Sequence, residues 1–148
     1  MTVRTRLLDR GVGRALSAVS AAAKKGLGDP ALAELVVIRA SQLNHCAFCL
    51  DMHLTVAREL GVSERKLDLL AAWEEAEGVF DERERAALSL TEAVTVVTDG
   101  FVPDPVYAAA ARHFDEGQLA HLIGLITAIN SWNRVMVSRR IEPGGYQP

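Results

Sequence analysis

The sequence has few of the features that identify several classes of protein. It contains two cysteines in 148 residues, too few for the disulfide framework of a small secreted domain. No apolar run approaches the roughly 18 residues that a transmembrane helix needs. The net charge is −3, and basic side chains lie scattered among acidic ones, which argues against nucleic acid as a partner. We therefore expect a protein that binds neither membranes nor nucleic acids.

The basic N-terminal segment lacks the organisation of a targeting sequence. Asp9 and several arginines interrupt residues 1–26 before an apolar core can form. We interpret the alanine-rich run 15–23 as a helix of the mature protein, and with no export signal we expect a cytoplasmic location. Two cysteines rarely form a static staple in that reducing compartment, so their pairing points to chemistry.

Apolar residues recur at spacings of three and four, and alternating runs are scarce, which is the pattern of an α-helical protein. Helix-start signals are frequent: Asp29 precedes Pro30, Ser63 precedes an apolar run, and Asp81 and Asp115 each have Glu or Gln three residues later. We expect an all-α single domain over residues 1–148, with about six or seven helices. The predicted helices span 15–23, 30–43, 46–60, 63–73, 81–97, 104–113 and 115–139, and the tail 141–148 is expected to be irregular.

The last predicted helix carries both an apolar stripe and a polar cluster. Its polar and aromatic residues could form a wall of the active site or an interface, but we favour a role in packing and in bonding helix ends. Trp73, outside this helix, we assign to the core or an interface. The cluster contains Asn130, Trp132, Asn133 and Arg134. The stripe contains Leu119, Leu122, Ile123, Ile126, Ile129 and Val137.

The residues that can carry chemistry gather in the helix that begins at Cys46. At about 100° per residue, Cys46, Cys49 and His53 fall on one apolar face, which Leu60 shares. Cys49 and His53 are four residues apart and are therefore neighbours. Phe48 falls on the polar side of this helix. We expect Phe48 to be exposed at a subunit interface, with a lid over the thiols as the alternative.

This arrangement is suited to thiol redox chemistry. Helical cysteines three residues apart can form a disulfide with modest adjustment, and the start of a helix favours a thiolate. A thiolate can attack the O–O bond of a peroxide and become a sulfenic acid, which a second thiol converts to a disulfide. His53 could take the thiol proton or protonate the leaving oxygen.

A third group is needed to hold the imidazole, and Glu34 is the candidate. It lies in an apolar stretch of the preceding helix, where a carboxylate must find a partner or shift its pKa upward. If Glu34 is instead an ordinary ion-paired residue, Arg39 and Arg134 are its candidate partners.

The same residues permit other functions. The pair could serve as a redox sensor that does not turn over, or as a dithiol that exchanges with a disulfide of a partner protein. It could also supply part of a zinc site, although the sequence has no clear second pair of ligands. That site would use Cys46, Cys49 and His53, with His45, His113 or His121 as the fourth ligand. We predict no metal and no cofactor.

The stretch from Glu34 to His53 closely resembles the active-site signature of the alkylhydroperoxidase D-like branch of the carboxymuconolactone decarboxylase family. That signature is a Glu, eleven residues, a Cys, two residues, a Cys, three residues and a His, and all four positions match. Segments 80–88 and 129–134 are also similar to single-domain members. The resemblance therefore covers about residues 34–134. It implies an all-α fold, a symmetric homo-oligomer (often a trimer or hexamer) and antioxidant reduction of hydroperoxides.

The resemblance also implies roles for individual residues. Cys49 would attack the peroxide, and Cys46 would resolve the intermediate and receive a dithiol reductant, in that group a lipoyl-bearing protein. Glu34 and His53 would form the proton relay. The peroxidase relatives carry another His between the cysteines, where this chain has Phe48. His45, directly before the pair, is the candidate replacement. The decarboxylases that name the family lack the cysteine pair, so we do not expect lactone decarboxylation.

Overall fold

The computed structural model describes Arg4 and residues 9–144, and its described residues form helices and connecting turns without a strand. This confirms the predicted all-α class. The helices are α1 (Arg10–Leu27), α2 (Pro30–Leu43), α3 (Ala47–Glu59), α4 (Glu64–Leu69), the short 3-10 helix η1 (Leu70–Ala72), α5 (Glu82–Thr95), α6 (Asp104–Ala111) and α7 (Glu116–Arg139). No helix in this part of the chain is long and apolar enough to cross a membrane.

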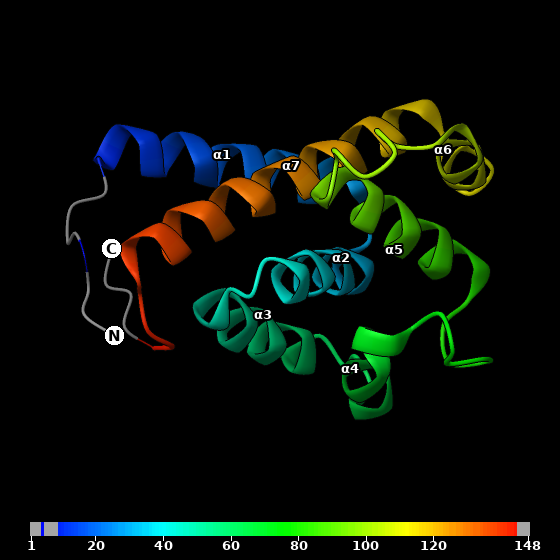
Figure 1. The fold of residues 1–148 in the computed structure, drawn as a ribbon, viewed down its shortest axis with the longest axis horizontal. Coiled ribbons are helices and arrows are strands. Elements are labelled where there is room, and N and C mark those ends of the chain that lie inside the picture. Colours follow the sequence, from blue (N-terminus) through cyan, green and yellow to red (C-terminus); the bar gives the residue numbers. More distant parts are fainter. Residues whose placement is uncertain (1–3, 5–8, 145–148) are drawn as a thin grey trace.

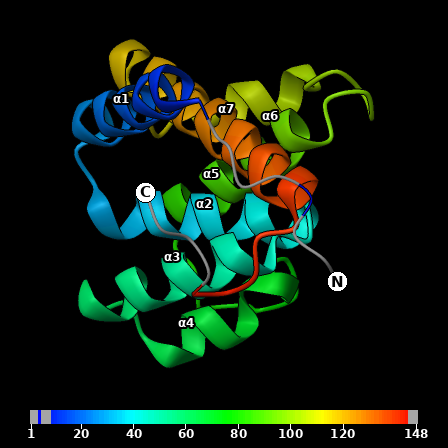
Figure 2. The same cartoon turned by 90° about the vertical axis from the view of Figure 1, so that its left-hand side faces the viewer.

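Helix α2 lies at the centre of the fold. It contacts α1 and α7 on one side and α3 on the other, and it also contacts α5 (Figures 1 and 2). Helices α1 and α7 lie side by side and run in opposite directions across the top of Figure 1, and α3 lies below α2. Residues 32–41 of α2 are buried except for a half-buried Arg39. A helix that is apolar on all sides belongs in a core, and this burial makes α2 the element against which the site is built.

Four predicted helix starts are confirmed, whereas the first helix begins at Arg10, capped by Asp9, and not at residue 15 as expected. The Asp29 carboxylate accepts the backbone N–H of Leu32, with Pro30 as the first helical residue, and Ser63 caps α4. Asp81 and Asp115 cap α5 and α7, each in a reciprocal capping box with the residue three positions later. These caps satisfy N–H groups that helix geometry leaves unpaired.

Some details differ from the sequence-based expectation. The segment 63–73 divides into α4 and η1, and α5 ends at Thr95 rather than at Val97. Leu60 and Val137 were predicted to face inward but are 46% and 47% exposed. Leu60 follows the last turn of α3, and Val137 lies in the last turn of α7. Residues 141–144 are irregular, as predicted, and 145–148 lie outside the described residues.

Candidate active site

The joint between α2 and α3 determines where the cysteines lie. The N–H of Cys46 donates to the carbonyl of Ser41 at 3.0 Å, and the N–H of His45 donates to that of Gln42 at 3.2 Å. These are the two bonds of a Schellman motif. His45 takes the left-handed position of the motif, with φ +53°, which glycine usually fills. The motif ends α2 and delivers Cys46 as the N-cap of α3.

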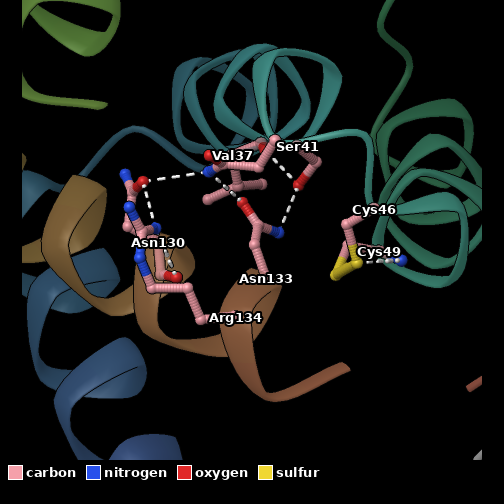
Figure 3. Close-up of a disulfide and its surroundings, with 8 residues drawn as sticks. Val37, Ser41, Cys46, Cys49, Asn130, Asn133 and Arg134 are labelled. Atoms are coloured by element: carbon pink, nitrogen blue, oxygen red, sulfur yellow. Dashed lines mark hydrogen bonds between the residues drawn. A yellow bond between two sulfur atoms is a disulfide. The ribbon is translucent and has the colours of Figure 1, made fainter. Parts of the chain in front are cut away.

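Cys46 and Cys49 form a disulfide, with their Cα atoms 5.3 Å apart (Figure 3). Both residues are buried, each only 2% exposed. The sulfur of Cys46 accepts the backbone N–H of Cys49 at 3.3 Å, so the pair itself caps α3. Both sulfurs therefore lie at the positive end of a helix, where a thiolate would be favoured after reduction.

Glu34 and His53 are in contact, as expected. Nδ1 of His53 lies 2.7 Å from Oε2 of Glu34, and both side chains are buried. The second oxygen of Glu34, Oε1, accepts a hydrogen bond from Nζ of Lys24 at 2.6 Å. Burial alone would raise the pKa of Glu34, but hydrogen bonds and charge interactions with His53 and Lys24 outweigh it and hold that pKa below its usual value. Glu34 is therefore a carboxylate at neutral pH.

Lys24 is the member of this group that the sequence did not predict. The two expected alternatives are wrong: Arg39 binds Glu92 at 2.8 Å, and Arg134 bonds to Asn130 one turn earlier in α7. Lys24 lies in the last turn of α1, and its approach to Glu34 depends on how α1 crosses α2. Local sequence patterns carry no signal for that crossing.

A cavity of about 400 Å³ opens beside the disulfide. Cys49 and His53 line it, whereas Cys46 and His45 do not. Its other walls come from α1, α2, α3 and α7. Most of these walls are apolar, and the polar ones are on α1. The apolar group includes Met52, Ile129, Trp132 and Met136, and the polar group is Ser17, Ser20 and Lys24.

Phe48 is a second correction. We expected it to be exposed at a subunit interface, but it is 8% exposed, lines the cavity and packs in a cluster with both cysteines and Met136. The helical position of Phe48 points away from α2, but α7 packs against that side of α3. The alternative interpretation, an aromatic lid over the sulfurs, fits this geometry.

A network of amides joins α7 to the end of α2. Nδ2 of Asn44 donates to Oδ1 of Asn130 and to Oδ1 of Asn133, each at 2.9 Å. Nδ2 of Asn133 donates to the hydroxyl of Ser41 at 3.0 Å, and Figure 3 shows the two side chains meeting beside the cysteine pair. Asn44 is the C-cap of α2, so the network holds the joint that places Cys46. This confirms the predicted packing role of Asn130 and Asn133.

We predict that Asn133→Leu lowers the free energy of unfolding by about 2–3 kcal/mol, because Leu keeps the volume but removes both bonds from a fully buried position. Urea denaturation followed by far-UV circular dichroism measures the change. The matched control is Thr127→Ala in the same helix, where an exposed hydroxyl bonds only to its own helix; it should cost less than about 0.5 kcal/mol. Equal losses in the two variants would contradict the role of the network.

The candidate zinc ligands are not assembled. Within residues 9–144 and Arg4, no group of three or more His, Cys, Asp or Glu side chains is placed to hold a metal ion. His121, proposed as a fourth ligand, is exposed and its Nδ1 donates to the carbonyl of Gly117.

Several known proteins are similar to this chain in sequence. The carboxymuconolactone decarboxylase family matches residues 10–93. The uncharacterized protein YdfG of Bacillus subtilis is 43% identical over 105 residues, which cover 71% of either chain. The uncharacterized protein YnjA of Escherichia coli is 37% identical over 99 residues, which cover 66% of this chain and 53% of that protein.

Two solved structures are similar along most of the chain. One is a protein of unknown function from Agrobacterium tumefaciens, provisionally described as the antioxidant defence protein AhpD; it has a TM-score of 0.85 and 32% identity, and the match covers 89% of this chain and 90% of that one. The other is an uncharacterized peroxidase-related protein from Silicibacter, with a TM-score of 0.72 and 19% identity over 88% of this chain and 69% of that one; it shows the fold alone. The chain belongs to the carboxymuconolactone decarboxylase family, as an AhpD-like member.

Proposed function

We propose that the protein is a thiol-dependent peroxidase in which Cys49 attacks the peroxide. The observation that carries this proposal is the asymmetry of the pair: Cys49 and His53 line the cavity, whereas Cys46 is bonded to Cys49 but does not line it. A substrate in the cavity would therefore lie against Cys49 and not against Cys46. Cys46 would be held behind it as the resolving thiol, as the family resemblance implies.

The reaction starts from the reduced pair. His53 takes the proton of the Cys49 thiol, and the thiolate attacks one peroxide oxygen. The O–O bond breaks, the sulfur keeps the OH as a sulfenic acid, and the other oxygen takes the proton from His53 and leaves as an alcohol. The Cys46 thiol then attacks the sulfenic sulfur, which forms the disulfide and releases water. The two thiols have supplied two electrons, and a dithiol must return two electrons and two protons.

The cavity walls favour organic hydroperoxides over hydrogen peroxide alone. A volume of about 400 Å³ lies in the range of sites for small organic molecules. Side chains such as Met52, Ile129 and Trp132 would bury the apolar body of an alkyl or aryl hydroperoxide, while its O–OH group lies against Cys49 and His53.

The burial of the disulfide limits which kinds of reductant can reach its sulfur atoms. Both cysteines are 2% exposed, so the flat surface of a folded partner cannot reach the sulfurs, which disfavours exchange with protein disulfides. A slender dithiol that enters the cavity can reach the disulfide from the side of Cys49, the cysteine that lines it. We propose a lipoyl-bearing protein as this reductant. A trimeric or hexameric assembly and a cytoplasmic location stay predictions.

A count of free thiols tests the proposal. The reduced, metal-free protein is mixed with a slight excess of cumene hydroperoxide, and thiols are measured before, after, and again after addition of dihydrolipoamide. We expect rapid loss of both thiols in each chain and their full return. Slow loss without cycling would indicate a redox sensor and reject the peroxidase. No loss at all would reject both.

A further inference from the structure

Lys24 joins the cavity to the buried carboxylate. Its Nζ lies 2.6 Å from Oε1 of Glu34, and its side chain is 36% exposed whereas that of Glu34 is 2% exposed. Lys24 also lines the cavity that Cys49 and His53 line. A single cationic side chain is therefore in contact with both the proton relay and the space where a substrate would sit.

The position of Lys24 follows from the end of α1. Ala23 and Leu27 are the buried residues of α1, and Lys24 borders them on the same face. Gly28, in the left-handed conformation with φ +69°, ends the helix, and Asp29 starts α2 directly after it. This tight turn brings the start of α2 close to the last turn of α1. The Lys24 stem can then lie along apolar surface while its ammonium reaches Glu34.

Lys24 and His53 are the groups that set the charge state of Glu34. No other side chain contributes to the pKa shift of this carboxyl among the described residues. Four charged or titratable side chains of the neighbouring helices α5 and α7 bond to groups other than Glu34. On α5, Arg83 binds Asp29 and Glu92 binds Arg39; on α7, Arg134 and His121 bond to groups of their own helix.

We propose that Lys24 is a positioning residue of the redox site, which keeps Glu34 ionised so that His53 is free to accept the proton of Cys49. Without a second cation, the Glu34–His53 pair would hold a proton of its own to neutralise the buried carboxylate. With Lys24 bonded to one oxygen, the carboxylate is already balanced, and the imidazole can exchange protons with the thiol. The use of this proton transfer in peroxide reduction rests on the proposed peroxidase function. The electrostatic effect of Lys24 on Glu34 and His53 does not depend on that function.

The sign of the effect follows from charge alone. Each proton that the cluster of Glu34, His53 and Cys49 releases makes the cluster more negative. A nearby positive charge therefore lowers the pH at which each proton is released, whichever group gives it up. Removing the charge of Lys24 must shift the appearance of the Cys49 thiolate to higher pH.

The test uses alkylation of Cys49 by iodoacetamide across a range of pH, in the full chain with Cys46→Ser so that one thiol reacts. Ser is a good N-cap residue and keeps the start of α3. Lys24→Met removes the charge at similar length. We expect the inflection of its rate profile to lie about one pH unit above that of the parent, which makes alkylation about tenfold slower at a pH below both inflections. The NMR titration of His53 should shift in the same direction.

Three variants separate charge from structure. Lys24→Arg keeps the charge and should restore the parent profile. Lys25→Met removes the neighbouring exposed charge and should leave the profile unchanged. Lys24→Gln keeps a neutral donor and replaces Lys24→Met if the latter does not fold; it should show the same upward shift. An unshifted profile in the uncharged Lys24 variants, or an equal shift in Lys25→Met, overturns the proposal.

These outcomes are independent of the peroxidase activity, because alkylation needs no peroxide. If the parent protein fails to consume cumene hydroperoxide but Lys24→Met shifts the alkylation profile, the proposed function falls and the role of Lys24 stands. If the protein consumes cumene hydroperoxide but Lys24→Met leaves the alkylation profile unchanged, the proposed function stands and the role of Lys24 falls.

Discussion

Cys49→Ser is expected to lower peroxide turnover by at least about three orders of magnitude, because the hydroxyl that replaces the thiol is a far weaker nucleophile and cannot form the sulfenic acid. Cys49 is the cysteine that lines the cavity. Ser fits the same volume at the third position of α3, so the fold should survive. The measurement is steady-state consumption of cumene hydroperoxide with dihydrolipoamide as reductant.

Cys46→Ser is the matched control for this prediction. It removes the resolving thiol but leaves Cys49 at the cavity, so without added reductant each chain should rapidly consume one equivalent of peroxide, stop, and retain a sulfenic acid. Dimedone, which traps sulfenic acids, should label Cys49 in this variant, as mass spectrometry would show. Continued turnover in Cys49→Ser, or a peroxide burst that survives there and is lost in Cys46→Ser, would reverse the assigned roles.

His53→Gln is expected to lower kcat/KM for cumene hydroperoxide by about 10²–10⁴-fold. Gln can still bond to Glu34, whose Oε2 lies 2.7 Å from Nδ1 of His53, but an amide cannot take a proton from Cys49 or pass one to the leaving oxygen. Stopped-flow measurement of the first oxidation isolates this step from reduction of the disulfide.

His45→Gly is the control that tests the other candidate relay. His45 is exposed and has φ +53°, a conformation that glycine adopts without strain. The Schellman motif uses only backbone atoms of this residue, so kcat/KM should stay within about twofold of the parent value. A loss as large as that of His53→Gln would mean that His45 carries the proton in place of the histidine that Phe48 replaces.

Much of the site was predictable because its parts lie close together in the chain. Cys46, Cys49 and His53 share one helix, and the helical repeat brings them onto one face whatever surrounds them. Glu34 and His53 are in contact although they lie 19 residues apart in the chain. We expected this contact for two other reasons: a buried carboxylate needs a partner, and the spacing of the two residues matches the family signature. For Asn130 and Asn133 the sequence indicated only a role in packing and did not identify the side chains to which they bond.

The sequence by itself determined the class of fold, most of the helix starts and the face of the helix that carries the cysteines, since caps and periodicity act within about four residues. Only the tertiary structure decided which other helices, and which cavity, each helix face contacts. Lys24 reaches Glu34 because the last turn of α1 meets the start of α2, Phe48 is buried because α7 also packs on α3, and Cys49 rather than Cys46 lines the cavity. Helix crossing depends on the packing of side chains far apart in the chain, which no local pattern records.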